Sequence, residues 1–184
     1  MSGIATRKFT YEDLRAMPQD GKRYELLEGE IYMAPSPRVK HQKVLGNLYL
    51  ALRRFADDRG LGEVYLAPLD VVLDDQNVVQ PDILFVCRER SLAITPLFIN
   101  GPPDLVVEVL SPSNADFDRT TKRRAYAAAG VPEIWYVDPM DDSIEVFRLG
   151  ADRAYILVRR LSGADVLVSE SFPGFELPLP TLFA

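Results

Sequence analysis

Apolar residues recur at helical spacing over residues 38–60, the longest amphipathic segment of the chain. The residues of the apolar stripe are His41, Leu45, Leu48, Leu52 and Phe55. A stripe of this kind predicts a helix that packs on a core with one face, and Gly60 is suited to end it.

Two shorter helices are predicted from their end signals. Residues 10–17 (TYEDLRAM) begin with Thr10 and Asp13 at capping-box spacing and stop before a proline. Residues 115–130 follow the turn SPSN, which is rich in capping residues, and end at Gly130 with a proline two positions beyond.

Segments rich in β-branched and aromatic residues predict strands between and after the helices. A hairpin is expected over residues 23–33, with Glu28-Gly29 at its turn. The other strand-like segments are GEVYLAPLDVVL (62–73), NVVQPDILFV (77–86), PDLVVEVL (103–110), EIWYVDP (133–139), SIEVFRL (143–149), AYILVRR (154–160) and DVLVSESF (165–172). This order predicts an α/β fold, a mixed central β-sheet flanked by helices, in a single domain over residues 1–184.

Two carboxylates interrupt strands that are otherwise almost wholly apolar: Asp82 in NVVQPDILFV and Glu108 in DLVVEVLSPS. An unpaired charge buried in a strand costs several kcal/mol or becomes neutral, so each acid needs a partner or a function. The strand around Glu108 is apolar on both faces, which predicts a central strand with Glu108 nearly buried at its end. If the two strands are neighbours, the carboxylates converge at one edge of the sheet. Such a pair would suit Mg²⁺, which takes one or two carboxylates plus waters and phosphate oxygens.

Lys122 is the third candidate. Asp118, Lys122 and Tyr126 recur at four-residue spacing and share one helix face, the face expected to pack on the sheet. A lysine near two acids can position or activate a water, or offset the charge of a phosphate under attack. Taken singly, each residue has an ordinary alternative: a strand acid satisfied at a turn or edge, or a solvated helix lysine paired with Asp118.

Composition narrows the function classes. No segment approaches the roughly 20 apolar residues of a membrane span, and the N-terminus lacks an apolar signal core, so the chain is expected to be cytoplasmic. One cysteine and one histidine argue against an internal disulfide and a zinc site. A net charge of −6 argues against non-specific coating of nucleic acid, although not against an enzyme that meets phosphate through a metal.

Beyond these patterns, the order PD (Pro81-Asp82) and then EVL (Glu108-Val109-Leu110) resembles the PD-(D/E)XK nuclease superfamily. The chain is more closely similar to the bacterial family labelled "putative restriction endonucleases". The similarity runs through FTYEDLRAMPQDGKRYELLEGE, APSPRVKHQKV, VVQPDILFV, DLVVEVLSPS and KRRAYAAAGVPEIWYVDP. One position departs: the superfamily lysine two residues after the acid is Leu110 here. In this family the lysine lies in the following helix, which points to Lys122.

The resemblance implies a restriction-endonuclease-like core with an N-terminal helix–hairpin extension, and Mg²⁺-dependent hydrolysis of DNA phosphodiesters, with Mn²⁺ as an alternative metal. Asp82, Glu108 and the backbone carbonyl of Val109 would bind the metal, and Lys122 would orient or activate the attacking water. A homodimer is expected because cutting both strands of a duplex needs two sites.

Two further residues are candidates for the catalytic site. Glu25 in RYELLEGE matches the family's N-terminal acidic position, and its alternative is an exposed hairpin residue. His41, the only histidine, continues the apolar stripe of the long helix and so faces the core or the site; a satisfied core histidine is the alternative. Asp70 is a weaker candidate on the first core strand.

Two other functions stay open. A nuclease-fold protein that binds nucleic acid or a protein partner without cleaving is favoured by the negative net charge and the displaced lysine, whereas tight Mg²⁺ binding would argue against it. A glycosidase with two catalytic carboxylates predicts activity in chelator and an aromatic-lined sugar cleft, which Trp135, inside a predicted strand, does not suggest.

Overall fold

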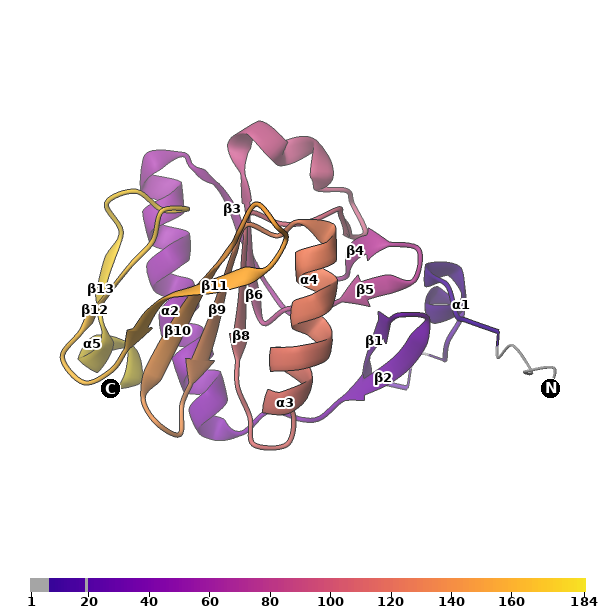
Figure 1. Ribbon diagram of the computed structural model, residues 1–184, viewed down its shortest axis with the longest axis horizontal. Helices are drawn as coiled ribbons and strands as arrows, with labels where there is room; N and C mark the ends of the chain where they lie inside the picture. The colour runs from indigo at the N-terminus through magenta and orange to yellow at the C-terminus, as the bar shows by residue number, and fades with distance from the viewer. Residues whose placement is uncertain (1–6, 19) are drawn as a thin grey trace.

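The computed structural model describes residues 7–18 and 20–184, so residues 1–6 and 19 of the predicted domain lie outside the described residues. A six-stranded sheet in the order β11-β10-β9-β8-β6-β3 forms the centre (Figure 1). Its strands are β3 (Gly62–Leu66), β6 (Ile83–Cys87), β8 (Leu105–Val109), β9 (Glu133–Asp138), β10 (Ser143–Leu149) and β11 (Tyr155–Leu161). β8 and β9 run parallel and the other neighbours antiparallel, which confirms the predicted mixed sheet.

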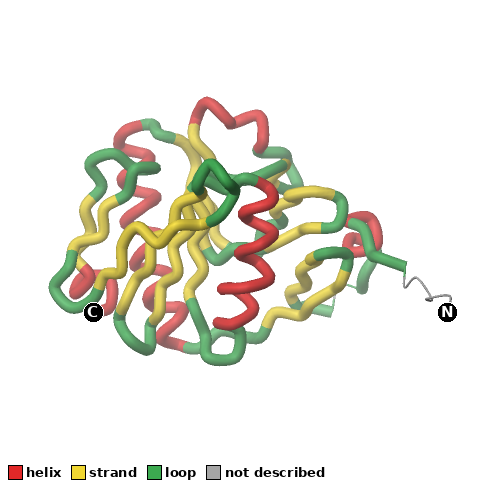
Figure 2. The backbone as a smooth tube through the Cα atoms, viewed as in Figure 1, coloured by secondary structure: helices red, strands yellow, loops and turns green. Residues whose placement is uncertain are grey.

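Helices cover both faces of this sheet (Figure 2). On one face, the buried leucines of α2 (Val39–Arg59) share a core cluster with Val107 of β8. On the other face lies a helical segment made of α3 (Ala115–Phe117), the π-helical turn η2 (Asp118–Lys122) and α4 (Arg123–Ala129). Tyr126 of α4 shares a second cluster with Val106 of β8. β8 therefore is the predicted central strand, apolar on both faces.

A second, five-stranded sheet in the order β2-β1-β5-β4-β7 lies toward the N-terminal side of the molecule (Figure 1). Its strands are β1 (Arg23–Leu27), β2 (Glu30–Ala34), β4 (Val71–Asp74), β5 (Asn77–Val79) and β7 (Ile99–Asn100). The β1–β2 hairpin turns at Glu28-Gly29, as predicted, and both residues have the positive φ that a tight hairpin turn requires. α1 (Tyr11–Arg15) precedes the hairpin and begins at the predicted capping box of Thr10 and Asp13.

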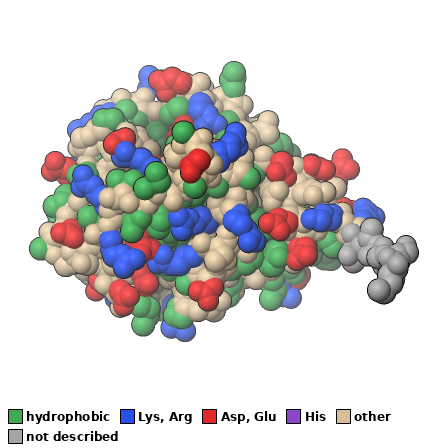
Figure 3. All heavy atoms as spheres, in the orientation of Figure 1, with side chains coloured by type: hydrophobic (Ala, Val, Ile, Leu, Met, Phe, Trp, Pro, Cys, Tyr) green, Lys and Arg blue, Asp and Glu red, His purple; other side chains and the backbone are tan. Residues whose placement is uncertain are grey.

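The remaining elements are η1 (Arg88–Ala93), β12 (Val166–Val168), β13 (Glu176–Pro178) and α5 (Leu179–Phe183). Leu182 of α5 packs into the core cluster of α2. Within the described part of the chain, no helix combines the length and the apolar character that a bilayer crossing would need. The face that carries α4 shows Lys and Arg side chains mixed with Asp and Glu side chains (Figure 3).

Three strand predictions were wrong in extent. Residues 62–73 form β3 and β4, and residues 77–86 form β5 and β6; in both cases the two halves belong to different sheets. Each break falls at a proline, Pro68 or Pro81, which has no N–H to donate to a strand ladder. Residues 165–172 contain only the short β12, and the hydroxyls of Ser169 and Ser171 beyond it donate to the buried carboxylate of Glu133.

Candidate active site

The two acids singled out in the sequence lie side by side at one end of the central sheet. β6 and β8 are antiparallel neighbours with Ile83 opposite Val107. Asp82 directly precedes Ile83 and Glu108 directly follows Val107, so the register brings the two acids to the same end. Pro81 ends the preceding strand, which places Asp82 at a junction between the sheets rather than in the middle of a strand.

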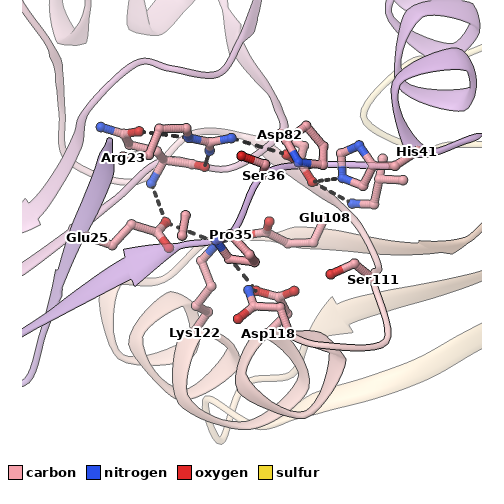
Figure 4. A pocket seen from close by; sticks show the side chains of 15 residues that line it. Arg23, Glu25, Pro35, Ser36, His41, Asp82, Glu108, Ser111, Asp118 and Lys122 are labelled. Atoms are coloured by element: carbon pink, nitrogen blue, oxygen red, sulfur yellow. Dashed lines mark hydrogen bonds and ion pairs between the residues drawn. The ribbon is translucent and has the colours of Figure 1, made fainter. Parts of the chain in front are cut away.

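Lys122 reaches this end of the sheet from the helical segment α3–η2–α4, on the face opposite α2 (Figure 4). Its Nζ lies 2.8 Å from Oε1 of Glu108, 3.1 Å from Oε1 of Glu25 and 3.5 Å from Oδ1 of Asp118. The lysine side chain is 4% exposed and the three carboxylate side chains 3–5%. Lys122 and Asp118 lie in the π-helical turn, a local irregularity that is common at functional sites.

Hydrogen bonds fix the carboxylate of Asp82 from two sides. Its Oδ2 accepts from the backbone N–H of Val109 at 2.9 Å and lies 3.3 Å from Nε2 of His41 on α2. Burial raises the pKa of Asp82, but the contact with His41, the charge of Lys122 and the Val109 N–H outweigh burial and hold the pKa below its usual value. Asp82 is therefore an oriented carboxylate at neutral pH.

Glu108 and Asp118 show the opposite shift. Burial, together with the charges of the neighbouring acids Asp118, Asp82 and Glu25, raises the pKa of Glu108 to about 8 against the attraction of Lys122. Burial also raises the pKa of Asp118 to about 6. Since one cation cannot offset every carboxylate, part of the cluster holds a proton at neutral pH.

Lys122 itself is an ammonium ion. Burial acts to lower its pKa, but the carboxylates of Glu108, Glu25 and Asp118 raise the pKa well above the usual lysine value. A lysine in this state donates hydrogen bonds and positive charge and has no lone pair with which to accept a proton. The two roles expected from the sequence, orientation of a water and its activation, both stay predictions.

Apart from the weaker candidate Asp70, the side chains predicted for the site line one pocket: Glu25, His41, Asp82, Glu108 and Lys122, together with Val109. The alternative of an exposed hairpin residue was wrong for Glu25, whose Oε1 accepts a 2.7 Å bond from the backbone N–H of Gln80. Leu110 lies in the second core cluster, so the position of the superfamily lysine is filled by a core side chain here.

Several residues of the site were missed in the sequence. Asp118 was noted only as a neighbour of Lys122, yet it lines the pocket. Tyr126 was expected only to pack, but its hydroxyl donates to Oε1 of Glu108 at 2.6 Å. The four-residue spacing of these residues with Lys122 was the available signal. Arg23 also lines the pocket, and nothing in its local sequence indicated this. Asp70 lies outside the pocket lining and accepts from the Gln80 side chain at 2.8 Å.

The chain is similar to known proteins over most of its length. Residues 11–180 match the model of the Uma2 family, described as "Putative restriction endonuclease". The chain belongs to this family. An uncharacterized protein of Synechocystis sp. is 24% identical over 176 residues, which cover 94% of this chain and 98% of that protein.

The fold of this family member is similar to a solved structure. The crystal structure of a putative nuclease belonging to DUF820 from Anabaena variabilis superposes with a TM-score of 0.80 and 21% identity, over 95% of this chain and 97% of that chain. At this identity the comparison establishes the fold. The predicted nuclease-like α/β architecture is thus confirmed.

The donor set of the pocket fits a hard divalent cation of the kind that restriction-endonuclease-like proteins generally use. Within the described residues, Oε2 of Glu108 and Oδ1 of Asp82 accept no hydrogen bond, so each acid presents one free oxygen. No three His, Cys, Asp or Glu side chains of that part of the chain are grouped to hold a metal by themselves. Mg²⁺ needs only one or two carboxylates and retains several waters, and the pocket has about 50 Å³ open to water.

Proposed function

We propose that this protein is a Mg²⁺-dependent nuclease that hydrolyses DNA phosphodiester bonds at the pocket of Asp82, Glu108 and Lys122. The observation that carries the proposal is the contact of the Lys122 ammonium with Glu108 at 2.8 Å, beside the oriented carboxylate of Asp82. The family description, "Putative restriction endonuclease", supports a nuclease function for this pocket of two acids and one lysine.

Asp82, Glu108 and the carbonyl of Val109 would hold the Mg²⁺, or Mn²⁺ in its place. When bound, the cation supplies charge that polarises the phosphate and lowers the pKa of a water. His41 and the Val109 N–H keep the Asp82 carboxylate in one orientation. Lys122 would donate a hydrogen bond to the attacking water, and Glu25 and Asp118 hold the lysine in place.

We infer that the natural substrate is DNA, that the enzyme acts as a homodimer in the cytoplasm, and that the chain is one domain. The family description supports a DNA substrate, and a family match that spans residues 11–180 supports a single domain. Two symmetric sites would allow both strands of a duplex to be cut. Light scattering of the purified protein tests the dimer: a monomer at micromolar concentration would contradict it.

Two other functions make different predictions. A nuclease-fold protein that binds without cleaving has no need of a tight Mg²⁺ site, so calorimetry with Mg²⁺ separates it from the nuclease. A glycosidase needs an aromatic-lined sugar cleft. Trp135 is fully buried, and so cannot stack on a sugar.

The test of the proposed function is cleavage of a supercoiled plasmid in Mg²⁺, in Mn²⁺ and in EDTA. The parent protein should nick the plasmid with either metal and not in EDTA. Asp82→Asn removes one charged ligand, and Lys122→Ala removes the ammonium, so both variants should lose cleavage. Asp104→Asn, which changes an acid paired with Arg90, is the matched control and should cleave normally. Cleavage by the parent in EDTA, or by Asp82→Asn at the parental rate, would refute the proposal.

A further inference from the structure

Arg23 lines the same pocket as the candidate catalytic residues, although the proposed reaction has no use for it so far. It is the first residue of β1, and its side chain is 30% exposed, whereas that of Lys122 is 4% exposed. In Figure 4 its guanidinium group approaches Asp82 from the side opposite His41. The pocket therefore has a second permanent cation, and this one is open to solvent.

The guanidinium of Arg23 is held on one edge only. Its Nε donates to the side-chain oxygen of Gln80 at 3.2 Å, and its Nη2 donates to the backbone oxygen of Gln80 at 2.9 Å. The Gln80 amide is itself oriented, because its Nε2 donates to Asp70, which also accepts from the Tyr11 hydroxyl at 3.2 Å. A chain of hydrogen bonds thus runs from α1 to the pocket and fixes the plane of the guanidinium.

The opposite edge of the guanidinium has unused donors. Within residues 7–18 and 20–184, Nη1 has no hydrogen-bond acceptor; the nearest carboxylate atom, Oδ1 of Asp82, lies 4.0 Å away. Lys122, in contrast, has three carboxylates within 3.5 Å. Of the two permanent cations in the pocket, Arg23 therefore has the charge that is least compensated and the donors that are least used.

The pocket as a whole is acidic, with four carboxyl groups against these two cations: Glu25, Asp82, Glu108 and Asp118. Besides a bound Mg²⁺, positive charge exposed on the protein itself attracts a phosphodiester, which is an anion, into such a pocket. Arginine suits this task because its planar fork binds two phosphate oxygens at once and stays charged at every physiological pH. The free edge of Arg23, next to Asp82, meets these conditions.

We propose that Arg23 is a phosphate-binding residue, which donates from its free edge to a non-bridging oxygen of the phosphodiester that enters beside Asp82. The proposal rests on the proposed function for the identity of that phosphodiester. Gln80 is the positioning residue, because it holds the bonded edge of the guanidinium. Asp70 and Tyr11, outside the pocket lining, act through Gln80.

The test compares parent, Arg23→Gln and Arg23→Lys in two assays. The first is binding of a fluorescent 20-base-pair duplex, with Ca²⁺ as the cation, between 50 and 200 mM KCl (about the range over which phosphate contacts weaken strongly). Arg23→Gln should bind at least about tenfold more weakly, the loss expected for a charge-assisted hydrogen bond. Its salt slope should fall by about 0.9, the value for one phosphate contact. Arg23→Lys keeps the charge and should be intermediate.

The second assay is plasmid cleavage in Mg²⁺, in which Arg23→Gln should raise KM more than it lowers kcat. Gln80→Leu removes the side-chain bond to Arg23 but keeps the backbone N–H that binds Glu25, and it should weaken duplex binding several-fold. Arg90→Gln is the matched control, because it removes the same charge as Arg23→Gln. Arg90 also makes two hydrogen bonds to protein oxygens, but it follows the opposite end of β6. It should change neither assay, and circular dichroism confirms that each variant is folded.

The outcomes separate the two proposals. A parent that cleaves, with Arg23→Gln unchanged in duplex affinity and salt slope, overturns the role of Arg23 alone. If the parent protein binds the duplex and Arg23→Gln weakens that binding, but the parent never cleaves, the proposed nuclease activity is overturned and Arg23 stays an anion-binding residue. A loss in Arg23→Gln that Arg90→Gln reproduces is a general charge effect and overturns the role of Arg23.

Discussion

Replacement of Lys122 by methionine tests whether the lysine holds the acidic cluster together. Methionine has a similar length and no charge, so the change removes the ammonium that lies within 3.5 Å of Glu25, Glu108 and Asp118. Breaking a buried ion pair by removal of one partner costs about 3–5 kcal/mol. Protonation of the carboxyl groups relieves part of this cost, because a neutral acid no longer needs the cation.

The loss should therefore depend on pH. The pKa values of Glu108 and Asp118 lie above their usual values even beside Lys122, and they rise further without it, so the folded variant holds protons that the unfolded chain releases. Raising the pH through that window lowers the free energy of unfolding. Glu108 has a pKa of about 8 even beside the lysine, so the window reaches beyond neutral pH. We expect a loss of about 1–2 kcal/mol at pH 5.5 and about 3–5 kcal/mol at pH 8.5, since each pKa unit corresponds to about 1.4 kcal/mol.

Urea unfolding followed by the fluorescence of Trp135, the single tryptophan and fully buried, measures this difference. Lys40→Met is the matched control, because Lys40 pairs with Asp142 at the surface and should cost at most about 0.5 kcal/mol at either pH. A loss for Lys122→Met that is equal at both pH values, or no larger than that of Lys40→Met, would refute the electrostatic account of the cluster.

Three further changes follow from the same contacts. Because the pKa of Glu108 is raised to about 8, a cation that binds below that pH must displace the proton of Glu108. Calorimetry should therefore show that the affinity for Mg²⁺ rises between pH 6.5 and 8.5, by up to about tenfold per pH unit. Equal affinities at the two pH values would contradict this prediction. Tyr126→Phe removes the 2.6 Å hydrogen bond to Glu108 and should lower the free energy of unfolding, measured by urea titration, by about 1–3 kcal/mol. The control is Tyr49→Phe at a half-buried tyrosine, which should change the free energy of unfolding by less than about 0.5 kcal/mol. His41→Leu leaves Asp82 held by the Val109 N–H alone, so Mg²⁺ should bind about 10–100-fold more weakly; unchanged affinity would mean that His41 is only a core residue.

Local sequence patterns were sufficient to predict the helices and most of the strands, and to predict the direction in which key side chains point. The period of α2 placed His41 toward the sheet, and the four-residue spacing of Asp118, Lys122 and Tyr126 placed Lys122 inward. The two apolar faces around Glu108 identified β8 as central. These predictions succeed because helix and strand periodicity alone decide which face of an element is buried.

The pairing of segments that are distant in sequence could not be predicted in the same way. Arg23 and Gln80 are separated by 57 positions and meet only because β1 pairs with β5. The division of residues 77–86 between two sheets depends on which strands are available on either side of Pro81, which no local pattern encodes. Glu25, which is almost completely buried, likewise contacts residues distant in the sequence, Gln80 and Lys122.

The central claim is that Asp82 and Lys122 act in one hydrolytic site, and a double-mutant cycle on plasmid cleavage tests it most directly. The rates of the parent, Asp82→Asn, Lys122→Met and the double variant are compared in Mg²⁺ at equal concentrations of folded protein. Residues that act as a unit give strongly non-additive losses, so each single variant should lose at least about 10³-fold and the double variant little more. Losses that multiply, a single variant that cleaves like the parent, or a parent that does not cleave would contradict the claim.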